Sequence, residues 1–270
     1  MLEYKSLNAV IGYPLVHSQS PLLHNTVYEA LNIHAVLLPL SNPALGPLIQ
    51  EIKTRSIGLT AVTMPFKQEI FSYLDDCGPE VQALKAANTI IQREGQLYGY
   101  NTDIDGIAYA LRDTIVAGKK VLILGAGGAA RALGYFMQRN HAKLFWLNRT
   151  QESAFKMVKY FSGDMLTPDQ AYRESVDIIV NATPVGMCPH VGVSPLPDYP
   201  FYSGQIVFDL VYNPVDTALL KQAQKAGATI ISGMDMFIGQ GLKQIELWSG
   251  RKLFHEHLMD KIKKELVALW

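Results

Sequence analysis

A glycine-rich turn directly after an apolar run restricts the folds open to this chain more than any other stretch. Residues 121–124 are apolar and lead into Gly125-Ala-Gly127-Gly-Ala-Ala130, a GxGxxA pattern. The first glycine permits a tight turn, the second lets the backbone approach a ligand, and the alanine still allows a helix to pack closely on a sheet. We therefore predict a strand, a turn and a helix start whose free N–H groups would bind a dinucleotide pyrophosphate.

The next apolar run indicates which dinucleotide this would be. Residues 143–147 end at Asn148-Arg149-Thr150, about twenty residues beyond Gly125. Sites for NAD usually place Asp or Glu there to bind the ribose hydroxyls, and this position has neither. The Arg149 guanidinium instead offers a planar fork for a 2′-phosphate, so we expect NADP.

Strand-like and helix-like stretches alternate along most of the chain. The predicted strands are residues 8–12, 34–40, 58–63, 89–92, 119–124, 143–147, 176–181, 205–211 and 228–231. The predicted helices are 21–31, 43–53, one that runs from the glycine-rich turn to about Asn140, and 215–225. Ser20 is expected as the N-cap of the first helix, with Pro21 at its first position. This alternation predicts an α/β protein with parallel sheets covered on both faces.

The C-terminal part differs because residues 234–270 are almost entirely helix-like, with a break near Ser249-Gly250. A terminal helical segment with no strands of its own is expected to cover an earlier domain. We therefore predict a discontinuous substrate-binding domain of residues 1–105 plus 239–270. Residues 106–238 would form the dinucleotide-binding domain.

Charge and composition exclude several classes of protein. The chain has 24 basic and 24 acidic residues, so the basic excess typical of nucleic-acid binders is absent and any anion site must be local. Cys77 and Cys188 are too few for a disulfide framework in 270 residues and fit a reducing compartment. No apolar run reaches the roughly 18 residues of a membrane span, and the N-terminus lacks a signal-peptide pattern. We expect a soluble cytoplasmic protein with no membrane, nucleic-acid or metal partner.

Polar clusters follow several of the predicted strands in the first half of the chain. They lie within residues 12–21, 61–67, 87–89 and 99–103. Each cluster alone could be ordinary turn chemistry. Together they place hydroxyls, amides, a lysine and an aspartate at strand ends, where open α/β sheets bind their ligands.

These clusters carry a resemblance to a known family. The motifs are His17-Ser-Gln-Ser-Pro21, Val62-Thr-Met-Pro-Phe-Lys67, Asn88-Thr89, Asn101-Thr-Asp103, Gly125-Ala-Gly-Gly-Ala129, Asn148-Arg-Thr150, Asn181-Ala-Thr-Pro-Val-Gly-Met187, Tyr212-Asn-Pro214 and residues 233–240. In this order they resemble the shikimate dehydrogenase family across almost the whole chain. The resemblance implies an α/β substrate domain completed by C-terminal helices, a Rossmann-like NADP-binding domain, and NADPH-dependent reduction of 3-dehydroshikimate to shikimate in chorismate and aromatic amino-acid biosynthesis.

The same resemblance assigns roles to individual residues. Lys67 and Asp103 would form the catalytic pair. Substrate would be bound by Ser18, Ser20, Thr63, Lys67, Asn88, Asp103, Tyr212 and Gln240. Cofactor would be bound by Gly125, Ala126, Gly127, Gly128, Ala129, Asn148, Arg149, Thr150, Ser153, Thr183, Leu210 and Gly233.

Some positions depart from the family pattern and keep alternatives open. Ala61 replaces the usual asparagine, Ser153 stands where a second phosphate-binding arginine is frequent, and Asp235 and Phe237 differ from the usual residues. One alternative is a quinate/shikimate dehydrogenase that uses NAD or NADP. Another is a non-catalytic dinucleotide-sensing module, which the presence of Lys67 and Asp103 disfavours. The chain is expected to act as a monomer or homodimer.

Overall fold

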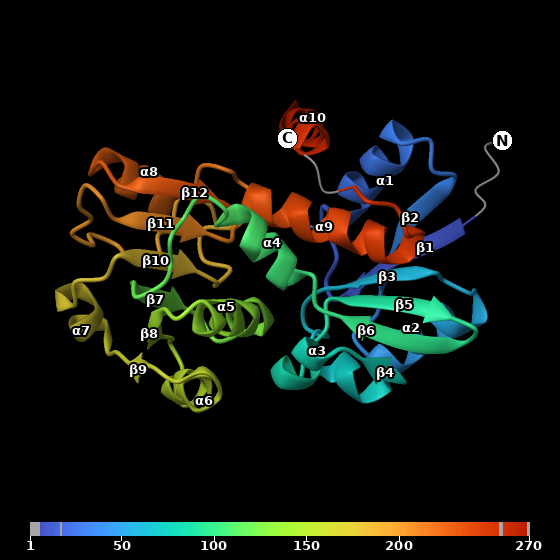
Figure 1. Ribbon diagram of the computed structural model, residues 1–270, viewed down its shortest axis with the longest axis horizontal. Helices are drawn as coiled ribbons and strands as arrows, with labels where there is room; N and C mark the ends of the chain where they lie inside the picture. The colour runs from blue at the N-terminus through green and yellow to red at the C-terminus, as the bar shows by residue number, and fades with distance from the viewer. Residues whose placement is uncertain (1–5, 17, 254–255, 269–270) are drawn as a thin grey trace. The chain divides into compact units, whose positions relative to one another are not determined.

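The computed structural model describes residues 6–16, 18–253 and 256–268. The chain divides into two compact units (Figure 1). Unit 1 comprises Met1–Gly106 and Ile238–Trp270, and unit 2 comprises Ile107–Phe237. Helix α4, Asp103–Ala110, and helix α9, Gly233–Ser249, contain the two points where the chain passes between units.

Unit 1 is built on a mixed six-stranded sheet with the order β2-β1-β3-β5-β6-β4. The strands are β1 Ser6–Gly12, β2 Ala35–Ser41, β3 Leu59–Val62, β4 Asp76–Cys77, β5 Thr89–Arg93 and β6 Gln96–Tyr100. Strand β1 pairs in parallel with both β2 and β3. The residue clusters that follow β1 and β3 therefore lie at the same end of the sheet, next to the carboxyl ends of these strands.

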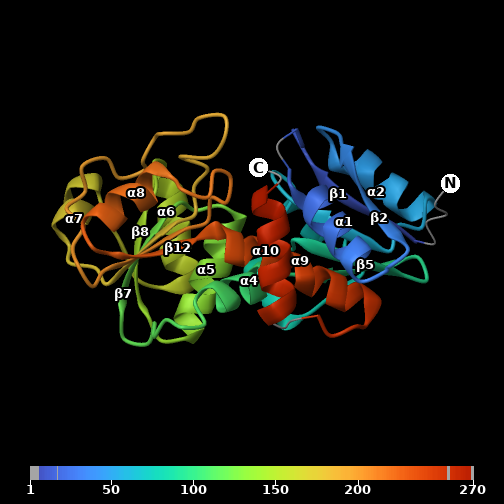
Figure 2. The ribbon, with the colours of Figure 1, turned by 90° about the horizontal axis from the view of Figure 1, so that it is seen from above.

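Helices cover both faces of this sheet (Figures 1 and 2). They are α1 Ser20–Ala30, α2 Leu45–Thr54, η1 Glu69–Tyr73, α3 Pro79–Leu84, the second part of α9, and α10 Glu256–Ala268. Ile11 of β1 packs with α2, η1 and α3, whereas the neighbouring Asn8 bonds the Tyr28 hydroxyl of α1 on the opposite face. Tyr28 also packs against Trp248 of α9, and α10 lies against α1.

The prediction of parallel sheets holds for only part of the unit 1 sheet. Strands β5 and β6 form an antiparallel hairpin, and β5 also pairs antiparallel with β3. Glu94 and Gly95 connect the hairpin, and both have positive φ, 50° and 79°. Two such residues form the turn whose twist matches paired strands, and glycine supplies the second position without strain.

The predicted N-cap of α1 is also wrong. Ser20 is the first residue of the helix, and the N-cap is Gln19, with no capping bond from its side chain. Pro21 is therefore the second helical residue and not the first, but it still lies in the first turn, where it needs no N–H partner. The Ser20 side chain is thus not used as a helix cap.

Unit 2 contains a fully parallel sheet with the order β12-β11-β10-β7-β8-β9. The strands are β7 Lys120–Leu124, β8 Lys143–Leu147, β9 Asp164–Met165, β10 Ile178–Asn181, β11 Ile206–Asp209 and β12 Thr229–Ser232. Chain order therefore runs outward in both directions from the neighbours β7 and β10. This is the doubly wound Rossmann order, and its ligand crevice lies where the two directions diverge.

Helices cover the two faces of the unit 2 sheet (Figure 1). Helices α5 Gly128–Arg139 and α6 Gln151–Phe161 lie on one face, and α7 Pro168–Arg173 and α8 Ala218–Lys225 lie on the other. Leu122, Ile179 and Val207 pack on the α7 and α8 side, and they contribute to one continuous apolar core. The predicted Rossmann-like fold, with a parallel sheet covered on both faces, is confirmed for this part of the chain.

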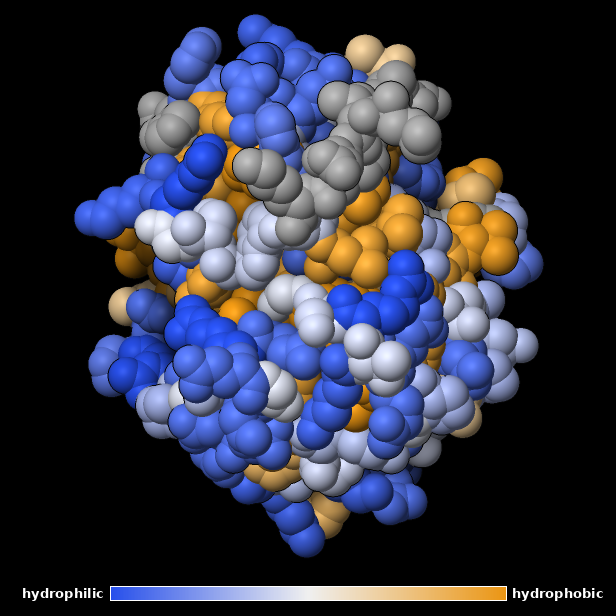
Figure 3. All heavy atoms as spheres, turned by 90° about the vertical axis from the view of Figure 1, so that its right-hand side faces the viewer, coloured by the Kyte–Doolittle hydropathy of each residue, from blue (hydrophilic) through white to orange (hydrophobic). Residues whose placement is uncertain are grey.

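On the face of unit 1 that Figure 3 shows, hydrophilic side chains predominate, with apolar ones in smaller groups between them. The exposed large apolar residues of this unit include Tyr13, Val16 and Met64. Tyr13 and Met64 belong to adjacent loops, since the Tyr13 N–H bonds the Met64 carbonyl at 3.0 Å. These loops follow β1 and β3, the same strands that carry two of the predicted site clusters.

Candidate functional site

A partly buried ion pair is the central feature of unit 1. Lys67 lies in the turns between β3 and η1, and Asp103 is the first residue of α4. The Lys67 Nζ lies 2.5 Å from Asp103 Oδ2, and the two side chains are 19% and 4% exposed. A lysine and an aspartate at this distance form a charge-assisted hydrogen bond that holds the ammonium in one place.

Asn88 holds the other oxygen of this carboxylate. Its Nδ2 donates to Asp103 Oδ1 at 2.9 Å and to Thr102 Oγ1 at 3.0 Å. Its Oδ1 accepts from the Thr102 N–H and from the Thr89 hydroxyl, each at 2.8 Å. Because a backbone N–H can only donate, the amide has one defined orientation, and its donor faces Asp103.

The remaining predicted substrate residues of unit 1 lie on three elements. Ser18 is in the loop before α1, Ser20 begins that helix, and both are partly exposed. Thr63 follows β3, and its N–H bonds the Ile11 carbonyl at 2.9 Å. Gln240 of α9 accepts from Asn88 Nδ2 at 3.4 Å, so the structure brings it together with the Lys67 pair. His17 lies outside the described residues.

Tyr212, another predicted substrate residue, belongs to unit 2. Its ring is stacked on Phe237, with centroids 4.1 Å apart and planes 14° from parallel. Phe237 is one of the positions where the chain departs from the family pattern. The departure therefore places a flat partner against a predicted substrate side chain.

The glycine turn of unit 2 lies at the divergence of strand order. Gly125 follows β7 with φ +108°, and a Cβ there would lie 3.1 Å from the Ala182 carbonyl after β10. Gly127 is the N-cap of α5 and is exposed, and a Cβ added to it would meet nothing within 4 Å. Ala126, Gly128 and Ala129 are partly exposed beside it. The helix start thus presents its unpaired N–H groups to an open approach.

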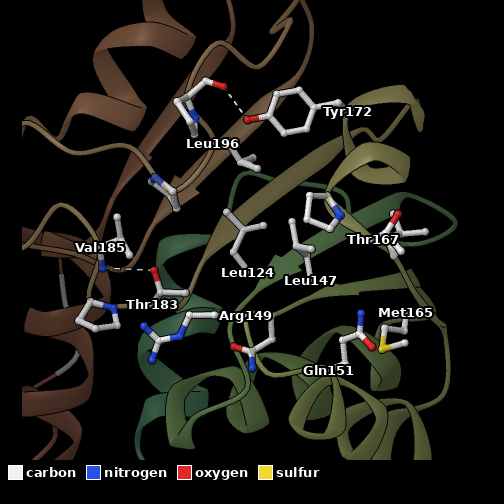
Figure 4. A pocket seen from close by; sticks show the side chains of 16 residues that line it. Leu124, Leu147, Arg149, Gln151, Met165, Thr167, Tyr172, Thr183, Val185 and Leu196 are labelled. Carbon is white, nitrogen blue, oxygen red and sulfur yellow. Dashed lines mark hydrogen bonds between the residues drawn. The ribbon is translucent and has the colours of Figure 1, made fainter.

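A cavity of about 720 Å³ opens beside this turn (Figure 4). It is lined by Leu124, Leu147, Asn148, Arg149, Gln151, Met165, Leu166, Thr167, Pro168, Tyr172, Thr183, Pro184, Val185, Pro195, Leu196 and Pro197. Figure 4 shows Leu124 and Leu147 in the middle of the view, between Thr183 on one side and Met165 and Thr167 on the other. Among these described lining residues, Arg149 carries the single charge. The cavity wall is thus mostly apolar, with some polar side chains and one cation.

Asn148, Arg149 and Thr183 are the predicted cofactor residues that line this cavity. Thr150 is the N-cap of α6, and Ser153 lies in its first turn, with its N–H bonded to the Thr150 carbonyl at 3.1 Å. The other lining residues were missed by sequence reasoning. Residues 165–172 and 195–197 carry no motif, and only their folding around β8 and β10 brings them to the cavity.

A buried carboxylate anchors the loop that carries Thr183. Asp209, at the end of β11, accepts hydrogen bonds from Asn181 Nδ2 at 2.9 Å and the Thr217 hydroxyl at 2.7 Å, and from the Val211 N–H at 3.0 Å. Asn181 Oδ1 in turn accepts from the Thr183 hydroxyl at 2.6 Å. Burial raises the pKa of Asp209 to about 6, although these three hydrogen bonds act in the opposite direction.

Gly233 and Leu210, the last two predicted cofactor residues, are adjacent in unit 2. A Cβ on Gly233, the first residue of α9, would collide with the Leu210 carbonyl and would lie 2.8 Å from the Val211 carbonyl. Only glycine therefore lets this helix start approach the chain after β11. The sequence showed the glycine but not the contact that requires it.

Other features of the described residues concern metal ligands, cysteines and membrane-spanning helices. No group of three or more His, Cys, Asp or Glu side chains in this part of the chain could hold a metal ion. Cys77 and Cys188 are free thiols. Within the same described ranges, no helix combines the length and apolar character that crossing a membrane requires.

Comparison with known proteins relates both units to one family. Residues 10–90 match the family model described as the shikimate dehydrogenase substrate binding domain. A relative from Carboxydothermus hydrogenoformans, named shikimate dehydrogenase (NADP(+)), is 37% identical, and the match covers 90% of this chain and 91% of the relative.

Solved structures extend the similarity to the fold. A shikimate dehydrogenase in complex with NADP+ is 33% identical, with a TM-score of 0.90 over 98% of this chain and 97% of that one. Shikimate 5-dehydrogenase from Thermus thermophilus, in complex with NADP(H) and shikimate, is 32% identical, with a TM-score of 0.86 over 96% of this chain and 99% of that one. Identity of this extent across both units shows that the chain belongs to the shikimate dehydrogenase family.

Proposed function

We propose that this protein is an NADP-dependent shikimate dehydrogenase, which reduces 3-dehydroshikimate to shikimate reversibly in aromatic amino-acid biosynthesis. The observation that carries the proposal is the Lys67–Asp103 pair held by Asn88. Ketone reduction needs a proton donor beside the oxygen on which negative charge develops. A lysine ammonium held in place by a buried carboxylate meets that need.

The residues of unit 2 fit the cofactor. The turn at Gly125 has φ +108°, which favours glycine, and a Cβ there would lie only 3.1 Å from the Ala182 carbonyl. The α5 start behind it offers N–H groups to a pyrophosphate. The cavity beside the turn falls within the roughly 300–1,000 Å³ range of small-molecule sites. Its apolar wall suits a ribose and base, and Arg149 suits a 2′-phosphate. Unit 2 is therefore proposed as the dinucleotide-binding domain and unit 1 as the substrate-binding domain.

The chain's own residues would share the chemistry as follows. The bound nicotinamide supplies or accepts the hydride. Lys67 would stabilise the substrate oxygen and donate its proton during reduction, and Asp103 would keep the ammonium oriented and accept a hydrogen bond from a substrate hydroxyl. Ser18 and Ser20 would bind the carboxylate, while Thr63, Asn88, Tyr212 and Gln240 would bind the other polar groups.

A rate matrix tests this proposal. Initial rates are measured at the nicotinamide absorption band with shikimate or quinate against NADP+ or NAD+. We expect the highest kcat/KM for shikimate with NADP+. A clear preference for quinate with NAD+ would establish the alternative activity, and no turnover with any pair would leave a non-catalytic dinucleotide-binding protein. We further expect the protein in the cytoplasm, as a monomer or homodimer.

A further inference from the structure

A buried glutamine of helix α9 lies directly behind the Asn88 side of the unit 1 site. Gln244 is 1% exposed, and its Nε2 donates to Thr89 Oγ1 at 2.9 Å and to the Asn88 carbonyl at 3.1 Å. A carbonyl oxygen can only accept, so the amide group of Gln244 must face Asn88. Gln244 lies one helical turn beyond Gln240, on the same side of α9.

The bond to Thr89 determines where the Thr89 hydroxyl proton points. Because Gln244 donates to Thr89 Oγ1, the single hydroxyl proton is free for another acceptor, and Asn88 Oδ1 lies 2.8 Å away. That bond and the Thr102 N–H occupy the oxygen of the Asn88 amide. The nitrogen of the amide is then directed at Asp103 Oδ1. A continuous chain of donors thus runs from Gln244 to the carboxylate that holds Lys67.

The bond to the Asn88 carbonyl acts on the backbone. That carbonyl also accepts from the Val62 N–H at 2.7 Å, so the segment before β5 is held between β3 and α9. The neighbouring Ala87 N–H bonds the Lys67 carbonyl at 2.8 Å. Gln244 therefore supports the backbone positions of both Asn88 and Lys67.

We propose that Gln244 is a positioning residue for the dehydrogenase reaction, acting through Thr89 and Asn88 on the Asp103–Lys67 pair. The inference rests on the proposed function. Gln244 touches none of the predicted reacting groups, and its effect is on the orientation of Asn88. His24, which is buried beside it, stays neutral because burial lowers the pKa of His24 to about 4, so no charge competes for the Gln244 amide.

The matched control is Gln205 of unit 2. It is 0% exposed, and its Nε2 also donates to a backbone carbonyl, that of Val176, at 2.9 Å. Among the residues that the structure describes, it has no bond to a predicted substrate or cofactor residue. Gln205→Met and Gln244→Met therefore remove the same kind of buried amide, and only the second interrupts the donor chain to Asp103.

The experiment compares these variants in the shikimate and NADP+ assay, with thermal unfolding measured in parallel. We expect Gln244→Met to lower kcat about tenfold and to raise the KM for shikimate several-fold, with the KM for NADP+ within about twofold of wild type. Gln205→Met should lower the Tm to a similar extent and leave all three constants near wild type. Simple destabilisation lowers the active fraction but does not raise one KM selectively.

A second pair of variants, at Thr89, tests the inference independently if Gln244→Met folds poorly. Thr89→Val removes the hydroxyl that passes the interaction on, and Thr89→Ser retains it. We expect Val to reproduce the shikimate-specific loss and Ser to restore most of the activity. Equal KM values for shikimate in Gln244→Met, Gln205→Met and wild type, or equal losses for Thr89→Val and Thr89→Ser, would overturn the inference. If wild type itself fails to oxidise shikimate with NADP+, the proposed function fails first, and this inference fails with it.

Discussion

Both units bury a carboxylate close to their predicted site, but the two carboxylates have different partners. Asp103 of unit 1 is paired with the Lys67 ammonium and with the Asn88 amide. Among the residues that the structure describes, the donors to Asp209 of unit 2 are all neutral and come from Asn181, Thr217 and Val211. Burial consequently raises the pKa of Asp209 to about 6.

The difference follows from what each carboxylate does. In the proposed mechanism, Lys67 of unit 1 carries the proton that the substrate oxygen receives, and Asp103 is the partner that holds this cation. Unit 2 only has to hold two loops together, and three neutral hydrogen bonds suffice for that. A buried carboxylate with a cation is therefore the catalytic candidate, whereas one with only neutral donors is a structural anchor.

The largest effect is expected from breaking the ion pair of unit 1. Lys67→Ala should lower kcat by about 10²-fold or more, with little change in NADPH binding, because the proton donor is lost while the cofactor residues lie in unit 2. Steady-state rates and cofactor titration measure both. Lys120→Ala, which removes an exposed lysine paired with Glu174, is the control and should keep wild-type rates. Near-normal turnover of Lys67→Ala would refute the catalytic assignment.

Low pH should lower the folding stability of unit 1, because His24 is buried in its neutral form. Burial lowers the pKa of His24 from 6.5 to about 4, so the unfolded chain takes up a proton first as the pH falls. Stability that is present above pH 6.5 is then lost as the pH falls towards 4, by about 3 kcal/mol. His24→Asn retains a donor for the Ser20 carbonyl but cannot titrate. The stability gap between wild type and this variant should narrow over that pH range, and a constant gap would contradict the assignment.

In unit 2, stability should change with pH in the opposite direction, because of Asp209. The pKa of Asp209 rises from 3.8 to about 6, so the unfolded chain loses its proton first as the pH rises. Stability present below pH 3.8 is lost as the pH rises to 6, again by about 3 kcal/mol. Asp209→Asn should remove this slope, and chemical unfolding at several pH values measures it. The two groups oppose each other in the whole chain, so only the single variants separate them. An unchanged slope in Asp209→Asn would show that the carboxylate is ionised without cost.

The smallest effect on activity is expected from Arg149, the exposed arginine beside the unit 2 cavity. Arg149→Leu should raise the KM for NADP+ about tenfold and leave the KM for NAD+ nearly unchanged, because only NADP+ carries the 2′-phosphate. Solvent screens an exposed arginine, which limits the loss. Kinetics with both cofactors measure the ratio. Equal losses for NADP+ and NAD+ would mean that Arg149 supports the loop and does not read the phosphate.

Unit 2 was more predictable from sequence than unit 1. Its strands are short apolar runs separated by helices, and the glycine turn marks where the sheet order diverges. Unit 1 contains the β5–β6 hairpin, whose Glu94-Gly95 turn is a weak local signal. The antiparallel pairing of β5 with β3 joins segments that are far apart in the chain, so local pattern does not predict it. The Ser20 cap was wrong because both Ser20 and Gln19 are compatible with a helix start before Pro21, and local pattern does not separate them.

For the candidate site, the sequence offered residues to consider but not the partners that those residues contact. Lys67, Asn88 and Asp103 stand in recognisable motifs, but their bonds join segments that are far apart in the chain. Asp209 and Gln244 are not predictable from the sequence, because a single Asp after a strand and a single Gln in a helix are common. Their significance lies in burial and in the neighbours that burial provides.

The sequence by itself determined the α/β class, the family, the glycine turn of unit 2 and the residue types available for ketone reduction. These features depend on local pattern and on chemistry carried by each side chain. The tertiary structure alone decided which carboxylate has a cation, which glycine lies against a carbonyl, and that Gln244 stands behind Asn88. Such choices depend on contacts between distant segments, and desolvation in those contacts sets the strength of each charge and hydrogen bond.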